Sequence, residues 1–189
     1  MTTRTTAIAA ALLASAALAA ALPGCNTAPK PENRETFVLE ANAAKQWFIK
    51  NVKGVESQLN SSAAYIVFPS VGQAGLIVGG SFGRGAVYDA SGKQVGWAVL
   101  NKGSIGLQIG AQGFKMLMVL EDEKTFRAFK DDAWRGSVAA TAVAAEEGAT
   151  ATAPFREGLA IYVGQQKGLM AGMDIALANI RYKSLADVE

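Results

Sequence analysis

The chain of 189 residues contains no histidine and a single cysteine, Cys25. Without histidine, the most common general base and metal ligand of proteins is missing, and neither a Ser-His nor a Cys-His catalytic pair can form. One thiol can form neither an internal disulfide nor a zinc cluster of cysteines. These absences exclude histidine-dependent hydrolases and the usual zinc proteins.

Motifs that mark nucleotide and calcium sites are also missing. The chain has no G-x-x-x-x-G-K-[ST] phosphate loop and no D-x-[DN]-x-[DN]-G calcium loop. Gly83-Arg84-Gly85 begins like a dinucleotide fingerprint, but Tyr88 stands where the third glycine belongs. The acids Glu121–Glu123 lie where we expect a helix to begin, which favours negative charge, and Asp174 has no visible second carboxylate. We therefore expect no enzymatic activity, no metal and no cofactor.

Charge of one sign is not in large excess. The chain has 18 lysine and arginine residues against 16 aspartate and glutamate residues, a net charge of +2. Proteins that bind nucleic acid through its phosphates carry a much stronger basic field. We therefore expect no nucleic-acid partner, and any binding of anions must come from a local patch.

The first 24 residues predict an export signal. Arg4 supplies a positive charge, Ala7–Leu22 is a continuous apolar run, and Leu22-Pro23-Gly24-Cys25 resembles a bacterial lipobox. In such sequences the cysteine becomes the first residue of the mature protein and carries acyl chains such as palmitate. Each buried methylene contributes about 0.8 kcal/mol of membrane affinity. We expect residues 1–24 to be a lipoprotein signal peptide; the alternative is an ordinary signal peptide with Cys25 near its end by chance.

The residues after the signal predict a tether and one domain. Pro29 and Pro31 favour extended backbone, so residues 25–32 read as lipid anchor and tether. Residues 33–189 are enough for a single core and a single domain. Asn26 follows the cysteine, which by the sorting pattern of enteric lipoproteins resembles outer-membrane delivery. The predicted location is the bacterial cell envelope, lipid-anchored at the outer membrane.

The apolar stretch Ala64–Leu120 predicts a β-sheet rich in glycine. Within Ser104–Gln112, apolar residues alternate with polar residues or glycine, which is the period of a strand. Glycine weakens a strand unless a bulge, a sharp bend or a close approach requires it. We expect an α+β fold with a strongly curved, barrel-like antiparallel sheet. The alternative is that the glycines form a smooth ligand face without side chains.

Turn residues set the expected strand boundaries. The expected strands and turns are Ala64–Phe68 stopped by Pro69, Gly75–Gly80, a hairpin of Gly85–Asp89 and Val95–Leu100, a turn at Asn101-Lys102-Gly103, a strand Phe114–Leu120, and a closing hairpin of Gly158–Val163 with Gly168–Ile180.

Two helices are expected beside the sheet. Apolar residues recur at helical spacing over Arg34–Val52, which predicts an N-terminal amphipathic helix with a basic character. Such a helix can lie on a membrane surface or pack its apolar stripe on the sheet, and the two are compatible. Asp122 predicts the start of a short second helix, Glu123–Lys130.

Three runs of residues resemble the SYLF domain family. They are VFPSVGQAGLIVGGSFGRG, then GSIGLQIGAQ followed by FKMLMVL, then KGLMAG, and the resemblance covers residues 63–180. The family occurs in exported bacterial lipoproteins and in eukaryotic proteins that bind lipids and actin. The resemblance implies a compact α+β domain with a curved antiparallel sheet that binds phospholipids, without catalytic residues.

We therefore expect the domain to bind phospholipid head groups at the membrane surface. The alternative is an interaction lipoprotein that binds a protein partner and uses lipid only as a tether, and the oligomeric state stays open. Cys25 is the expected lipid anchor. Four residues in or directly after the first helix and two residues at predicted turns are the candidates for lipid binding: Lys45, Trp47, Lys50, Lys53, Arg84 and Lys102.

Overall fold

The computed structural model describes residues 28–74, 78–105, 112–132, 139–141, 143–145, 152–164, 174–176 and 180–188. The predicted signal peptide, Cys25 and the beginning of the tether lie outside these described residues.

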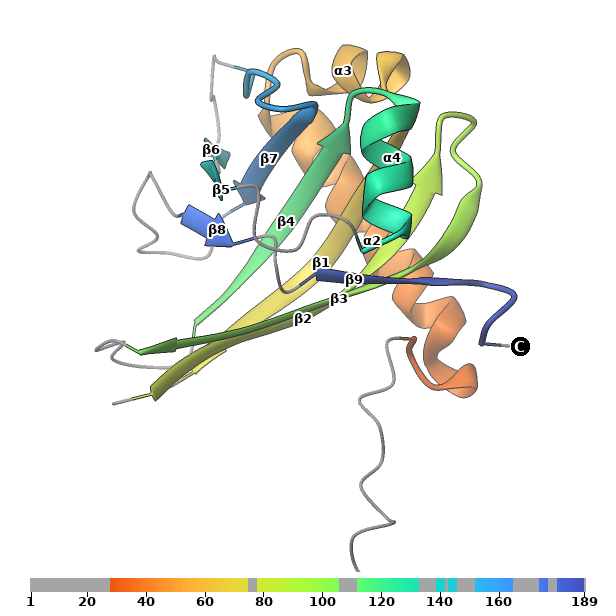
Figure 1. Cartoon of the computed structure of the whole chain (residues 1–189), viewed down its shortest axis with the longest axis vertical. Helices are drawn as coiled ribbons and strands as arrows, with labels where there is room; N and C mark the ends of the chain where they lie inside the picture. The colour runs from red at the N-terminus through yellow and green to blue at the C-terminus, as the bar shows by residue number, and fades with distance from the viewer. Residues whose placement is uncertain are drawn as a thin grey trace, which may run out of the picture.

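Seven strands form one open, twisted sheet in the order β6-β7-β4-β1-β2-β3-β9 (Figure 1). All neighbouring strands are antiparallel except β6 and β7, which are parallel. A separate pair joins β5, Ala139–Thr141, to β8, Asp174–Ala176. The strands of the main sheet are β1 Ala64–Ala74, β2 Val78–Asp89, β3 Gln94–Ile105, β4 Gln112–Leu120, β6 Val143–Ala145, β7 Leu159–Gly164 and β9 Ile180–Ser184.

This topology confirms the α+β class and shows that the expectation of a barrel is wrong. The two edge strands, β6 and β9, are separated by five strands and do not pair with each other. The sheet therefore twists without closing.

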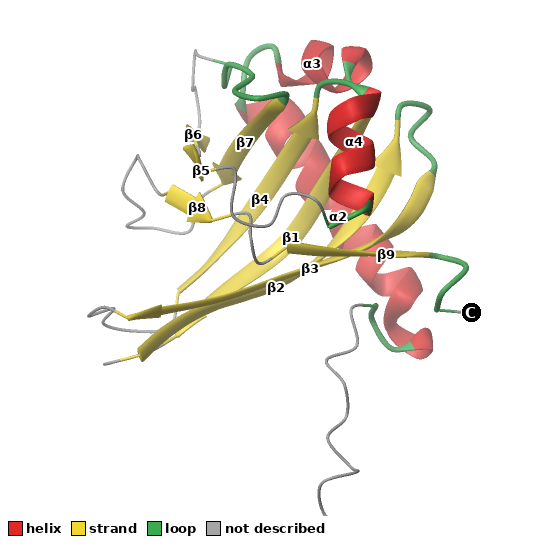
Figure 2. Ribbon diagram, viewed as in Figure 1, coloured by secondary structure: helices red, strands yellow, loops and turns green. Residues whose placement is uncertain are grey.

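The helices flank the sheet on both sides (Figure 2). A short 3-10 turn η2, Pro31–Asn33, leads into α2, Arg34–Asn51, which is followed by α3, Val55–Ser61; α4 is Glu123–Lys130. A helix lies at each of the two expected places: α2 ends one residue before the expected end, and α4 has the expected bounds. Asp122 is the N-cap of α4: its Oδ1 accepts a hydrogen bond of 2.8 Å from the backbone N–H of Thr125.

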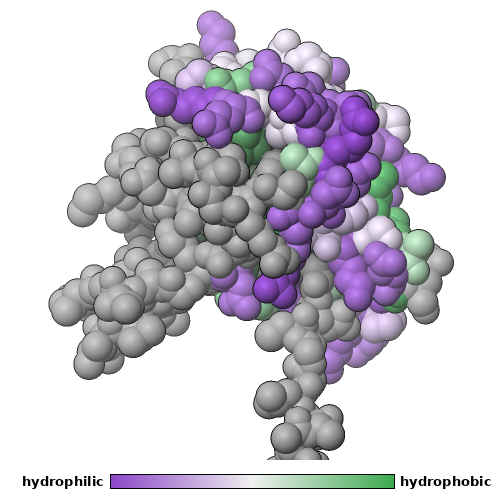
Figure 3. Space-filling view, viewed as in Figure 1, coloured by the Kyte–Doolittle hydropathy of each residue, from purple (hydrophilic) through white to green (hydrophobic). Residues whose placement is uncertain are grey.

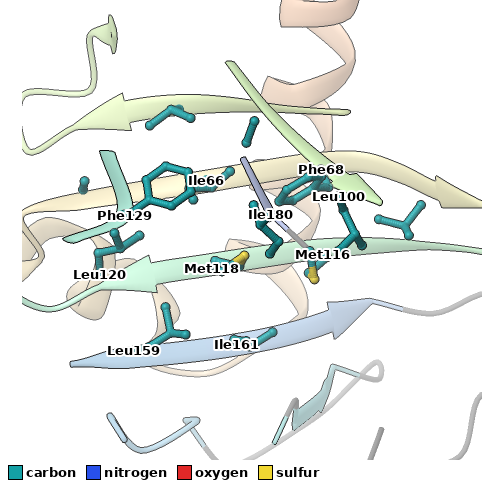
Figure 4. Close-up of a cluster of buried hydrophobic side chains, with 14 of the residues drawn as sticks. Ile66, Phe68, Leu100, Met116, Met118, Leu120, Phe129, Leu159, Ile161 and Ile180 are labelled. Atoms are coloured by element: carbon teal, nitrogen blue, oxygen red, sulfur yellow. The ribbon is translucent and has the colours of Figure 1, made fainter. Parts of the chain in front are cut away.

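Two hydrophobic cores lie on opposite faces of the sheet. On the α2 face, Ala41, Ala44 and Phe48 of the helix pack against alternate side chains of the strands, among them Trp97 and Tyr162. Full burial of one such large side chain stabilises the fold by roughly 1.5–3 kcal/mol. The opposite face is here called the α4 face, because α4 packs on it. Figure 4 shows its core, which includes Ile66, Phe68, Met116, Met118, Ile161 and Ile180.

The first strand is longer than its proline predicts. Pro69 does not end β1, which continues to Ala74. The register with both neighbouring strands shifts between Val67 and Val71, so Pro69 lies at a β-bulge, where its missing N–H breaks no ladder hydrogen bond.

Two further predictions of turns are wrong. Asn101-Lys102-Gly103 lies inside β3, and Arg84 lies inside β2 opposite Val99. Both strands are longer than expected, because their pairing continues to the last facing pair, Val78 and Ile105. The predicted closing hairpin is also wrong: β7 pairs with β4 and β6, whereas β8, in the described part of Gly168–Ile180, pairs with β5.

Several glycines are explained by close packing. A Cβ atom on Gly83 would come 2.8 Å from the Val71 side chain, and one on Gly85 would come 3.0 Å from the Phe68 ring. Both contacts lie on the α4 face, where these side chains belong to the core. At these two positions the interpretation of glycine as a packing device is confirmed.

Candidate functional site

The described strands place four cations on the α2 face of the sheet: Lys115, Arg84, Arg181 and Lys183, the last paired with Trp97 of the α2-face core. Strand residues alternate between faces, and the neighbours of each cation along its strand, such as Phe114 and Met116 around Lys115, belong to the core of the α4 face. The same alternation places Arg84, between Gly83 and Gly85, on the α2 face. Arg181 follows Ile180 of the α4-face core and lies on the α2 face as well.

The strand register aligns three of these cations in one row, here called the basic row: Lys115, Arg84 and Arg181. Lys115 of β4 pairs with Gly164 of β7 and lies opposite the bulge of β1. Ser70 of that bulge pairs with Arg84 of β2. Val99 of β3 then pairs with Arg84 on one side and with Arg181 of β9 on the other. The residues paired with these cations in the register are Gly164, Ser70 and Val99. Neighbouring strands are about 4.8 Å apart, so the Cα atoms of successive cations are about 10 Å apart.

An exposed aromatic side chain stands next to the row. Phe82 keeps 43% of its surface exposed and, with Leu39 of α2, is one of two large apolar residues with high exposure among the described residues. Its ring lies 5.2 Å from the guanidinium carbon of Arg84, within the range of a cation–π contact. Its partner in β1 is Gly72, and a Cβ atom there would meet only the Phe82 carbonyl oxygen, at 3.8 Å. A side chain at Gly72 would therefore meet no close packing, unlike one at Gly83 or Gly85.

Trp47 joins α2 to this row. Its ring lies 5.7 Å from Nζ of Lys115 and packs edge-on against Phe48. Trp47 is half-buried over Gly164, so its ring is held against the sheet and its contact with Lys115 is fixed by the helix. The predicted candidate Trp47 thus lies beside the basic row.

Lys45 is turned away from the row. Its Nζ donates a hydrogen bond of 3.3 Å to the hydroxyl oxygen of Tyr65 and lies 5.4 Å from the Tyr65 ring and 5.8 Å from the Tyr88 ring. The two rings stack at 5.0 Å. Burial, and then the nearby Tyr65, raise the pKa of Tyr88 to about 12, so the Tyr88 ring stays neutral beside the ammonium group.

The remaining predicted residues do not form one cluster. Lys50 and Lys53 are exposed at the end of α2. Lys45 and Lys50 are five residues apart, which rotates them by about 140° around the helix axis, so they do not share a face. Lys102 lies in β3 opposite Ser81, and Cys25 lies outside the described residues.

Two residues of the row escaped the sequence analysis. Lys115 is the only charge in the apolar segment Phe114–Leu120, and this was the one signal available for it. Arg181 gave no signal. Both become recognisable only with the register, because 31 residues separate Arg84 from Lys115 in the chain and 66 separate Lys115 from Arg181.

Across the described ranges, no helix has the length and apolar character needed to cross a bilayer. Within the same residues, no three histidine, cysteine, aspartate or glutamate side chains gather as a metal site. Neither a comparison with protein-family models nor a search of curated proteins finds a match to the chain.

Proposed function

We propose that this chain is a lipid-anchored protein of the bacterial cell envelope whose domain binds phospholipid head groups through the basic row and Phe82. The observation that carries the proposal is the alignment of Lys115, Arg84 and Arg181 on one face of the sheet, next to an exposed aromatic ring. Cys25 supplies the covalent attachment at the outer membrane. The resemblance to the SYLF family points to the same lipid chemistry.

The chemistry of the row suits phosphate groups. Arginine presents a planar fork that bonds two phosphate oxygens at once, and lysine adds a compact point charge. Phe82 stands on the same face as Arg84 and enters the boundary between head groups and acyl chains, where aromatic rings are favoured. Leu39, 64% exposed on α2, adds an apolar contact on that side of the sheet.

The expected strength is moderate and depends on salt. A basic residue near an anionic membrane contributes about 1 kcal/mol, and three of them correspond to on the order of 100-fold in affinity. The screening length is about 10 Å at 0.1 M salt, so binding weakens as the salt concentration rises. Lys50 and Lys53 add to the attraction without forming part of the row.

Co-sedimentation of Asn26–Glu189, which lacks Cys25, with anionic and neutral vesicles tests the proposal. The charge-neutral variant of the row carries Lys115→Gln, Arg84→Gln and Arg181→Gln. Its matched control removes three exposed cations of α4, which lies on the opposite face of the sheet and has a hydrophilic outer side in Figure 3. This control carries Lys124→Gln, Arg127→Gln and Lys130→Gln.

The proposal predicts binding to anionic vesicles that the row variant loses and the α4 variant keeps. Equal loss in both variants would show attraction by net charge alone. No binding by the unaltered protein to any vesicle would leave Cys25 as the membrane contact and favour a protein partner for the domain. Thermal unfolding of each variant separates loss of binding from loss of fold.

A further inference from the structure

A cavity of about 270 Å³ lies between α2, α3 and the turn that joins β2 to β3. It uses no residue of the basic row. Figure 1 places α3 and this turn at one end of the molecule and the entry of the chain into α2 at the other. The cavity is therefore distant from the tether that leads to the predicted anchor.

One wall of the cavity carries a positive charge in a fixed position. Lys45 lines the cavity, and its ammonium group is held by the Tyr65 hydroxyl and by the stacked rings of Tyr65 and Tyr88. An ammonium group has three N–H donors, and Tyr65 takes one of them. Among the described residues, no carboxylate pairs with Lys45. The cation is thus positioned with donors to spare.

The opposite helix supplies the complementary charge. Glu56, in the first turn of α3, is the one acid among the cavity-lining residues, and within the described part of the chain no cation pairs with it. The amides of Gln46 and Asn60 also line the cavity and can donate or accept hydrogen bonds. Ile49 and Leu59 provide the apolar part of the wall.

We propose that this cavity binds a small zwitterion that carries one anionic group and one primary ammonium group. The anionic group, a phosphate or a carboxylate, contacts Lys45, and the ammonium group contacts Glu56. The volume is below the range of about 300–1,000 Å³ typical of drug-sized ligands, which limits the occupant to a small molecule or to the head of a larger one. This site goes beyond the proposed binding of membranes by the basic row and does not depend on it.

Two sources can present this chemistry. One is a free molecule in solution, such as phosphoethanolamine or an amino acid. The other is the head group of phosphatidylethanolamine in a bilayer. Both place one anionic group and one ammonium group a few bonds apart, so the same two side chains recognise them.

Calorimetric titration of the full chain in non-ionic detergent tests the proposal, with phosphoethanolamine as the probe and inorganic phosphate as the anion-only comparison. We expect saturable binding of phosphoethanolamine. Lys45→Met keeps the aliphatic stem over the tyrosine rings and should weaken binding of both probes by about tenfold or more. Glu56→Gln should weaken the binding of phosphoethanolamine to a similar extent and leave the binding of inorganic phosphate unchanged.

Lys93→Met is the matched control, because Lys93 is exposed on the same turn and does not line the cavity. Repeating the titration in micelles that contain phosphatidylethanolamine distinguishes the two sources. If the lipid head group enters the cavity, the lipid competes with the probe. If only a free molecule enters the cavity, the titration is unchanged. Absence of saturable binding, or equal binding by the Lys45, Glu56 and Lys93 variants, would overturn the proposal. Glu56 is exposed, so Glu56→Gln keeps the test valid even if Lys45→Met reduces stability.

Discussion

The ring of Trp47 occupies the space into which a side chain on Gly164 would project. A Cβ atom at Gly164 would lie 2.5 Å from Cζ3 of Trp47 and 3.0 Å from the ring of Phe48. The missing side chain lets α2 approach β7 closely. It also fixes Trp47 next to Lys115, at one end of the basic row.

Gly164→Ala is therefore expected to destabilise the protein by about 1–3 kcal/mol, because two aromatic rings of the helix must shift. Gly72→Ala is the matched control: its Cβ atom makes only an ordinary contact of 3.8 Å with the Phe82 carbonyl oxygen, and the change in the free energy of unfolding should stay below about 1 kcal/mol. Urea unfolding of both variants measures the difference. Equal stability of the two variants would contradict the close packing of α2 on β7.

Two buried tyrosines should respond differently to loss of the hydroxyl group. Tyr162 accepts a hydrogen bond of 3.0 Å from the backbone N–H of Ala153 and donates one to Oε1 of Gln58. The hydroxyl of Tyr88 is buried and has no hydrogen-bond partner among the described residues. Tyr162→Phe should cost about 1–3 kcal/mol of stability, and Tyr88→Phe should be neutral or stabilising. Denaturant unfolding of the two variants side by side checks the order.

The same tyrosines predict a loss of stability at alkaline pH. Burial raises the pKa of both Tyr88 and Tyr162 to about 12. In the unfolded chain their pKa is about 10. Between these values the unfolded state releases protons that the folded state keeps. The contribution of the two tyrosines to the free energy of unfolding is therefore fully present below pH 10 and decreases as pH rises toward 12. The double variant Tyr88→Phe/Tyr162→Phe should lose less stability between pH 9 and about 11.5; an unchanged slope would contradict this assignment.

The carboxyl group of Asp122 should make the stability of the protein depend on pH in the acidic range. Hydrogen bonds from the backbone and side chain of Thr125 lower the pKa of the Asp122 carboxyl group. Its contribution to stability is therefore present above the unfolded pKa of about 3.9 and is lost as pH falls through the lower folded value. Asp122→Ala should lower the melting temperature at pH 7, and the gap to the unaltered protein should shrink near pH 3. A constant gap would show that the charge of Asp122 has no part in capping α4.

Local patterns predicted the helices well. The boundaries of α2 and α4 follow from apolar spacing and from the Asp122 cap, which are properties of neighbouring residues in the chain. The strands were harder, because their lengths depend on partners. Pro69 reads as a strand end until the bulge in β1 is known, and Asn101-Lys102-Gly103 reads as a turn until its pairing with β2 is known.

The candidate site depends even more on register. Lys115, Arg84 and Arg181 come from three strands that are far apart in the sequence, and only strand pairing brings them into a row. Lys45 and Trp47 are two residues apart on α2, yet one faces the cavity and the other faces the row. The sequence identified Trp47 and Arg84 as candidates without showing that they belong to the same face of the sheet.

The most direct test of the proposed function asks which face of the domain meets a membrane. The chain has one cysteine, so Asn26–Glu189 carrying Phe82→Cys or, as the matched control, Arg127→Cys takes an environment-sensitive dye at one position. We predict that anionic vesicles shift the emission at position 82 to shorter wavelength and leave that at position 127, on α4, unchanged. A shift at position 127 alone, or at neither position, would contradict binding through the α2 face.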